Sequence, residues 1–455
     1  MTHSIPEPTP VFDHLADFTL NRAATEIPTS ARARAALLLL DTLGIAAAAA
    51  PMEAGIIARN TAVALYGAGD PDQAAPILFD GRRVSIAGAG FAAASQIDNL
   101  DGHDGYNPTK GHIGVAVVPA LAALAAARPD LSGAEALATL VIGYEVAGRA
   151  GLALHDTVSD YHTSGAWNAL GVAAMAARLR GLKPGQLRHA LGIAEYHGPR
   201  SQMMREIANP TMLHDGSGMG AMVGLSAAVL AEAGFTGAPA ITLEAPEAAA
   251  HWADLGQLWQ TELQYIKPYP ICRWAHAPID AARVLRRDHA LPPDQITRIT
   301  IRSFANAVAL YPGLPGTTSQ AQYSLPFSVA AMLVHGQVAL DQIADAGLAD
   351  AQVARLVGLT DLQMEPRHEA RFPEGRWADI EIALTDGRVL KSGDYNARGG
   401  PDEPFSEADI CAKFMTFAAP VLGQPRAAAI REACLALATG DVPFSTLLDL
   451  LHEAP

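Results

Sequence analysis

Lysine is scarce in this sequence, and acidic residues outnumber basic ones. The five lysines are Lys110, Lys183, Lys267, Lys391 and Lys413, and Lys plus Arg number 32 against 47 acidic residues. The formal net charge of −15 makes nucleic acid and anionic membranes unfavourable partners. An acidic protein that handles an anionic substrate must gather its few cations locally. Lys110 and Lys267 lie in unusual polar motifs, which makes them candidates for substrate binding.

Cysteines and targeting signals are also few. Cys272, Cys411 and Cys434 have no paired spacing, so the sequence predicts neither a disulfide framework nor a zinc knuckle. The first residues lack the basic head and apolar core of a signal peptide. The apolar run 35–50 contains an aspartate and is short for a membrane span, so it predicts a buried helix. We therefore expect a cytoplasmic protein.

The sequence motifs of several common enzyme classes are missing. There is no G-x-G-x-x-G after a strand, no Walker loop, no H-E-x-x-H and no G-x-S-x-G. What the sequence has instead is alanine: half of its 455 residues are apolar, whereas aromatic residues make up 6%. This composition predicts a mainly α-helical protein of two or three domains.

Hydrophobic patterns divide the chain into helical and mixed parts. Thr29 and Ser30 are expected to cap a long helix over 31–50, and Ser132 starts a capping box before another helix. The alternating run 296–302 predicts a strand, and residues 377–391 predict a hairpin around Asp-Gly. We therefore predict a large helical domain from residues 1–265 and 401–455, with an inserted α+β lid domain from residues 266–400.

One polar stretch between two small-residue helices is the first candidate site. It holds these ionisable residues: Asp98, Asp101, His103, Asp104, Lys110 and His112. Burying such groups is costly unless they are paired or used in chemistry, so the cluster indicates a site. The alternatives are a polar loop that caps two helices and, less favoured, a divalent metal site made of oxygen and imidazole ligands.

Two further stretches could contribute to the same site. In residues 196–220, Arg200 could bind a carboxylate, and His214 precedes a Gly-Ser-Gly turn at a helix start. In residues 267–276, two prolines fix the chain that carries Lys267 and Arg273. The alternative for residues 196–220 is a glycine-rich loop without a catalytic role, and the alternative for residues 267–276 is a rigid interdomain linker.

Along nearly its whole length, the chain resembles the MmgE/PrpD family. That family includes 2-methylcitrate dehydratase, cis-aconitate decarboxylase and iminodisuccinate epimerase. The matching motifs, in chain order, are Leu39-Leu-Asp-Thr-Leu-Gly44, Asp98…Asp101…His112, Gly143-Tyr-Glu-Val, His162 before a small-residue helix, Gly234-Phe-Thr-Gly237 and Lys267-Pro-Tyr-Pro. The resemblance implies a helical domain with a smaller lid, a homodimer, and a cleft site that needs neither cofactor nor metal.

The resemblance also assigns residues. Asp101, His112, His162 and Lys267 match active-site positions of the family, and Tyr144 matches a candidate acid/base of the epimerase-like members. Three positions depart from the family pattern. Thr211 or His214 stands near the position of a common lysine, Cys272 at a decarboxylase histidine, and Phe327 at a decarboxylase tyrosine, with Tyr323 one turn earlier.

The resulting functional hypothesis is a lyase of the dehydratase type that acts on a small di- or tricarboxylate. It would remove a proton beside a carboxylate, which needs a nearby base and stabilisation of the developing charge. The candidate groups for proton transfer are His162, His214 and Tyr144, with Asp101 orienting His103 or His112. The candidate carboxylate ligands are Lys267, Lys110, Arg200 and Arg273. The alternatives are an epimerase or isomerase of an amino- or imino-dicarboxylate, and a non-catalytic carboxylate-binding protein.

Overall fold

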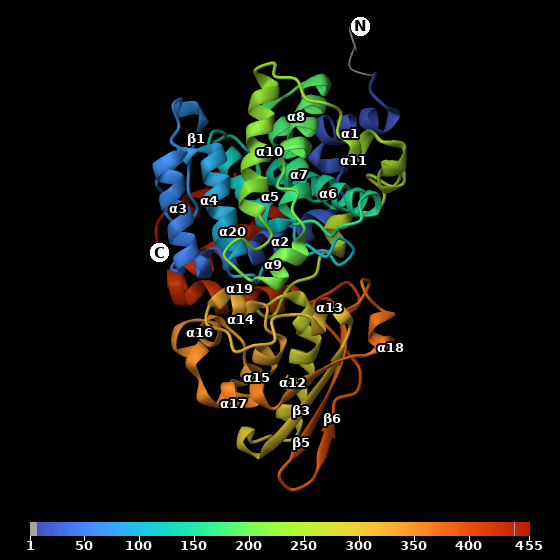
Figure 1. Ribbon diagram of the computed structural model, residues 1–455. Coiled ribbons are helices and arrows are strands. Elements are labelled where there is room, and N and C mark those ends of the chain that lie inside the picture. The colour runs from blue at the N-terminus through green and yellow to red at the C-terminus, as the bar shows by residue number, and fades with distance from the viewer. Residues whose placement is uncertain (1–6, 441) are drawn as a thin grey trace.

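A computed structural model describes residues 7–440 and 442–455, and within them the protein is mainly helical, as the composition predicts (Figure 1). The first part of the chain forms a helical body. Its helices are α1 Pro10–Leu20, α2 Thr29–Ala49, α3 Glu53–Leu65, α4 Ile86–Asp98, α5 Gly114–Ala125, α6 Gly133–Thr157, α7 Gly165–Arg180, α8 Pro184–His197, α9 Met203–Ala208, α10 Ser217–Glu232 and α11 Ile241–Glu244. A short antiparallel pair, β1 Ala74–Pro76 and β2 Arg83–Ser85, precedes α4.

Small residues let the central helices pack closely. Every residue of α5 is buried, and α6 and α7 cross beside it. At the crossing, a Cβ on Gly171 would lie 2.6 Å from the carbonyl oxygen of Gly143. Larger side chains would hold these helices apart, so the alanine and glycine content sets the tight packing of the core.

The second part of the chain carries the larger sheet. Its helices are α12 His276–Asp288, α13 Ala305–Val308, α14 Thr318–Gln322, α15 Leu325–His335, α16 Leu340–Ile343, α17 Ala351–Gly358 and α18 Pro366–Glu369. Its strands are β3 Ile296–Ser303, β4 Thr360–Met364, β5 Trp377–Leu384, β6 Val389–Lys391 and β7 Tyr395–Asn396. The strand order is β4-β3-β5-β6, with β3 and β4 parallel, β5 antiparallel to β3 and β6, and β7 paired with β5.

Cross-strand pairs fix the register of this sheet. Ile299 lies opposite Ile382, and Ile301 lies opposite Ile380, all of them buried. The face they form packs against α12, which contacts β5 and α15. The predicted strand over 296–302 and the hairpin around Asp-Gly are therefore confirmed, and Gly387 takes the positive φ of 85° that the turn needs.

The last helices return to the helical body. They are α19 Glu407–Leu422, α20 Gln424–Thr439 and α21 Ser445–Leu451, and α19 and α20 both pack against α2 (Figure 1). A buried ion pair joins α19 to α2: Lys413 Nζ on α19 lies 2.5 Å from Asp41 Oδ1 on α2. One expected cap is wrong: Thr29 is the first residue of α2, and Pro28 before it makes no side-chain cap hydrogen bond.

Two apolar segments bear on the membrane question. Helix α6 is long and apolar enough to cross a membrane, but 94% of its apolar window is buried inside the protein. Helices α2 and α3 together would also qualify by length, but they are bent by 92° at their junction. Burial of this kind is what the core helix of a helical domain requires.

Candidate active site

A small pocket lies where the helical body meets the strand-bearing segment. Its lining combines ionisable and aromatic residues from distant parts of the chain: Asp101, Lys110, His112, Tyr161, Met203, Ile207, Asp215, Tyr265, Cys272, Arg273, Trp274, Tyr323 and Arg376. Segments from both predicted domains therefore contribute side chains to one pocket.

Asp101 and Lys267 form a buried ion pair at this cavity. The Lys267 ammonium is fully buried, contacts the Asp101 carboxylate and also donates a hydrogen bond to the Asp101 carbonyl oxygen at 3.0 Å. Asp101 has a φ of 53°, and Lys110 has a φ of 55°. Left-handed backbone is costly for such residues and persists only where the surroundings enforce it, which is common at functional sites.

His112 presents one ring nitrogen to the carboxylates around the cavity. Its Nδ1 lies 2.7 Å from the carbonyl oxygen of Asp104, and a carbonyl can only accept, so Nδ1 carries the hydrogen. The lone pair is therefore on Nε2, which lies 3.9 Å from Asp101 Oδ1 and 3.6 Å from Asp215 Oδ2. Burial, and then the charge of Lys267, lowers the pKa of His112 well below its ordinary value. The imidazole is therefore a neutral base at neutral pH.

Three cationic side chains border the same space. The Lys110 ammonium lies 5.1 Å from the centre of the Tyr161 ring, and burial lowers its pKa. Arg273 lies over Tyr265 and donates to the carbonyl oxygen of Ala397 at 2.9 Å. Arg376 donates to the carbonyl oxygen of Asn107 at 3.2 Å. Because a guanidinium has five N–H groups, both arginines keep donors beyond these contacts.

Six of the predicted residues are not among those that line the pocket: His103, Tyr144, His162, Arg200, His214 and Lys267. The side chain of His162 turns to the carbonyl oxygen of Asp160 at 2.9 Å, and the neighbouring Tyr161 lines the cavity instead. Arg200 is exposed. The ring of His214 is buried 5.8 Å from that of Tyr323, and the next residue, Asp215, supplies the lining side chain. The predicted roles of His162, Arg200 and His214 stay hypotheses that this geometry does not favour.

Tyr144 and His103 are two of these residues, and they belong to a network behind the pocket. The Tyr144 hydroxyl donates to Asp104 Oδ2 at 3.1 Å, and burial raises its pKa well above the ordinary value. Burial also raises the pKa of Asp104 to about 6. His103 packs edge-on against His112, with ring centres 4.6 Å apart, and is fully buried. This network supports His112 from the protein side.

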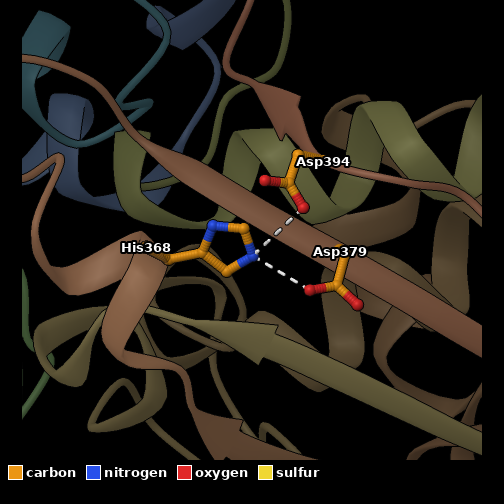
Figure 2. Close-up of side chains that lie close together, drawn as sticks. All are labelled: His368, Asp379 and Asp394. Carbon is orange, nitrogen blue, oxygen red and sulfur yellow. Dashed lines mark hydrogen bonds and ion pairs between the residues drawn. The ribbon is translucent and has the colours of Figure 1, made fainter.

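A second ionic cluster lies in the strand-bearing segment, outside the cavity. His368 Nε2 lies 2.9 Å from Asp379 Oδ1 and 3.9 Å from Asp394 Oδ1, a spacing that could suit a metal ion (Figure 2). Guanidinium groups already bind both carboxylates: Arg302 pairs with Asp379 at 2.9 Å, and Arg371 pairs with Asp394 at 3.0 Å. An added cation would be repelled by these arginines, so we interpret the cluster as an ion-pair network that fixes the sheet.

Comparison with known proteins identifies the family. Residues 13–260 match the MmgE/PrpD N-terminal domain, and residues 269–438 match the MmgE/PrpD C-terminal domain. The chain belongs to the MmgE/PrpD family. The cis-aconitate decarboxylase of Homo sapiens is 28% identical over 359 residues, which cover 73% of each chain. The cis-aconitate decarboxylase-like protein oryM of Aspergillus oryzae is 25% identical over 99% of each chain. A cis-aconitate decarboxylase of Aspergillus terreus is 22% identical over 96% of this chain and 95% of its own.

The three departures from the family pattern have clear structural positions. Thr211 does not line the cavity, and its hydroxyl donates to Glu206 Oε2 at 2.8 Å. Cys272 lines the cavity, and burial raises the pKa of its thiol to about 12. Tyr323 lines the pocket, whereas Phe327 is buried and does not line it. The pocket therefore has a tyrosine in its lining although Phe327 stands at the family's tyrosine position.

Sequence reasoning missed four polar residues of the pocket. Tyr161, Asp215, Tyr265 and Arg376 line it, but none of them was a predicted site residue. Asp215 directly follows the predicted residue His214 and directly precedes the Gly-Ser-Gly turn. Arg376 comes from the segment just before β5, and only the fold brings it to the carbonyl of Asn107.

Proposed function

We propose that this protein is a lyase of the dehydratase type that acts on a small di- or tricarboxylate. The reaction would begin when His112 removes a proton from the carbon beside a carboxylate. The observation that carries the proposal is the position of His112 Nε2, a neutral base that faces the cavity carboxylates and has cations nearby.

Local charge favours a polycarboxylate ligand in spite of the acidic sequence. Lys267 neutralises Asp101, and burial raises the pKa of Asp215 well above its ordinary value, which favours the uncharged carboxyl. The charges left to meet a ligand are those of Lys110, Arg273 and Arg376. Charge-assisted bonds to these groups would hold the carboxylates and stabilise the negative charge that develops when the proton leaves.

A bound polyanion would also improve His112 as a base. The imidazole is neutral because it is buried near Lys267, and a neighbouring negative charge favours its protonated form. Substrate binding would therefore raise the pKa of His112 towards the range that suits proton transfer at neutral pH. Histidine bases of this kind contribute ~100- to 10,000-fold to turnover.

Dehydration is preferred to decarboxylation because of Cys272. The relatives are named cis-aconitate decarboxylases, and the resemblance assigns a decarboxylase histidine to this position. With a pKa of about 12, the thiol stays protonated and can supply neither a base nor a cation at neutral pH. Tyr144, the epimerase candidate, is buried behind the cavity, so the epimerase reading has less support.

The test is a panel of substrates followed by mass change and NMR. The purified protein is incubated in D₂O with citrate, 2-methylcitrate, malate, cis-aconitate and aspartate. Loss of water from a hydroxy acid, or addition of water to cis-aconitate, is the expected result. Loss of CO₂ would instead make the protein a decarboxylase, deuterium uptake alone would favour the epimerase, and binding without turnover would favour a non-catalytic protein.

Matched arginine variants test the binding part of the proposal. Arg376→Met removes a cavity cation, whereas Arg200→Met removes an exposed guanidinium that the sequence had also suggested. A charge-assisted hydrogen bond contributes ~1.5–3 kcal/mol, so we expect Arg376→Met to weaken binding or kcat/KM by about 10- to 150-fold. Arg200→Met should match the wild type. Equal effects of the two variants would contradict the assignment of the cavity.

A further inference from the structure

We propose that Asp215 is the general acid of the reaction and gives its carboxyl proton to the hydroxyl group that leaves the substrate. This inference rests on the proposed function and adds a catalytic residue to it. His112 and Asp215 would then act as a base and an acid on the same bound molecule.

Asp215 is held in a defined position beside His112. It lies between His214, with a φ of 45°, and Gly216, with a φ of 65°, just before α10. Its main-chain carbonyl accepts a hydrogen bond from the Gly165 amide at 3.0 Å. The Ser164 hydroxyl donates to Asp215 Oδ2 at 2.9 Å and accepts from the His112 amide at 3.0 Å. One hydroxyl thus fixes both proposed catalytic residues.

The other carboxyl oxygen of Asp215, Oδ1, has no partner in the described part of the protein. It is buried, although the side chain lines the cavity. A buried polar atom without a partner is unfavourable, and in an enzyme it often marks the place of a ligand. A substrate hydroxyl next to Oδ1 would satisfy this atom.

The surroundings of Asp215 favour its protonated form. Burial raises its pKa well above the ordinary value, and the negative charges of Asp98 and Asp101 act in the same direction, whereas Ser164 and Lys267 oppose them. With Oδ2 accepting the hydrogen of Ser164, Oδ1 is the oxygen left to carry the proton in the proposed role. The unpartnered atom would then be an O–H donor on a side chain that lines the pocket.

The proposed step balances in protons and electrons. His112 Nε2 takes the proton from the carbon beside the carboxylate, and the C–H electron pair forms a C=C bond. The neighbouring C–O bond breaks, its oxygen takes the Asp215 proton, and water leaves. The proton on His112 then returns to the Asp215 carboxylate, whose Oδ2 lies 3.6 Å from Nε2. Substrate becomes an unsaturated acid and water, and the enzyme is restored.

The test separates leaving-group protonation from proton removal at carbon. The probes are citrate, 2-methylcitrate and malate, each paired with the analogue that carries chloride in place of the hydroxyl. Chloride leaves as an anion and needs no acid, so it does not depend on Asp215. The variants are Asp215→Asn and, as a control, Asp80→Asn, which changes an ion-paired carboxylate outside the cavity.

We expect Asp215→Asn to lose at least ~100-fold in water elimination but to eliminate chloride within a few-fold of the wild type. It should also keep deuterium exchange at the carbon next to the carboxylate. Equal losses on both leaving groups, or no loss on either, would overturn the role of Asp215. A wild type that neither exchanges nor eliminates would overturn the proposed function itself, and this inference with it.

A second variant keeps the inference testable if Asp215→Asn does not fold. Ser164→Ala removes a hydrogen bond that favours the charged carboxylate, so the pKa of Asp215 should rise further. The charged or titratable groups around it are Asp98, Asp101, Lys267, His112, Tyr161 and Tyr323. The alkaline limb of kcat/KM should then move to higher pH than in the wild type. An unmoved limb, or one at lower pH, would contradict Asp215 as the acid.

Discussion

Replacing Lys413 by methionine should destabilise the protein in a pH-dependent way. Lys413 lies on α19, and its ammonium contacts Asp41 Oδ1 on α2 at 2.5 Å and the carbonyl oxygen of Gly102 at 2.7 Å. Asp41 is buried, and its Oδ2 has no partner among the described residues, so the pairing rests on Lys413. Burial raises the pKa of Asp41, and Lys413 opposes that rise.

The size of the effect follows from the protonation of Asp41. Without Lys413, the buried carboxyl becomes neutral in the folded state but stays charged above pH ~3.9 in the unfolded state. At about 1.4 kcal/mol per pH unit, the free energy of unfolding at pH 7 falls by up to about 4 kcal/mol. This agrees with the ~3–5 kcal/mol found when a buried pair loses one partner. Near pH 4 that part of the loss should vanish.

Urea unfolding at pH 4.5 and pH 7 measures this prediction. The folded state of Lys413→Met binds more protons than its unfolded state, so its stability relative to the wild type should decrease as pH rises. The double variant with Asp41→Asn removes the charge and should recover most of the loss at pH 7. A deficit that is equal at both pH values, or a double variant no better than Lys413→Met, would refute the reasoning.

Three further predictions concern the cavity. The profile of kcat/KM against pH should be bell-shaped. Activity should fall at low pH as His112 gains its proton, at a pKa well below its ordinary value, and at high pH as Asp215 loses its proton, at a raised pKa. A profile with a single limb would count against this pair. His112 Nε2 and Asp215 Oδ2 lie 3.6 Å apart, so both residues would reach the substrate from one side. NMR with stereospecifically deuterated substrate should therefore show that the proton and the hydroxyl leave from the same face of the substrate. Loss from opposite faces would be inconsistent with this arrangement. The Cys272 thiol, with a pKa of about 12, should react slowly with iodoacetamide at pH 7 by mass spectrometry, and rapid labelling would contradict its protonated state.

Much of the fold follows from local patterns in the sequence. Ser324 caps α15 by accepting the Phe327 amide at 3.4 Å. Ser132 likewise caps α6 at the Glu135 amide. These features depend on residues three or four positions apart, which a sequence displays directly.

The site was less predictable, because side-chain direction in loops depends on distant contacts. The sequence led to His162 and His214, but their neighbours Tyr161 and Asp215 line the cavity. Sequence spacing fixes direction in a helix or strand, whereas an irregular loop with a φ of 45° at His214 obeys no such period. Arg376 could not be found at all, since its place depends on how the second part of the chain packs against the first.

The most direct test of the account is the rate of deuterium uptake beside a carboxylate, measured by NMR for the wild type and His112→Asn. Asparagine retains a donor that can reach the Asp104 carbonyl, but it removes the basic nitrogen. The account predicts that the wild type exchanges the carbon-bound proton of its substrate and that His112→Asn does so at least ~100-fold more slowly, with the substrate still bound. Exchange at the wild-type rate in a folded His112→Asn protein would show that another group removes the proton.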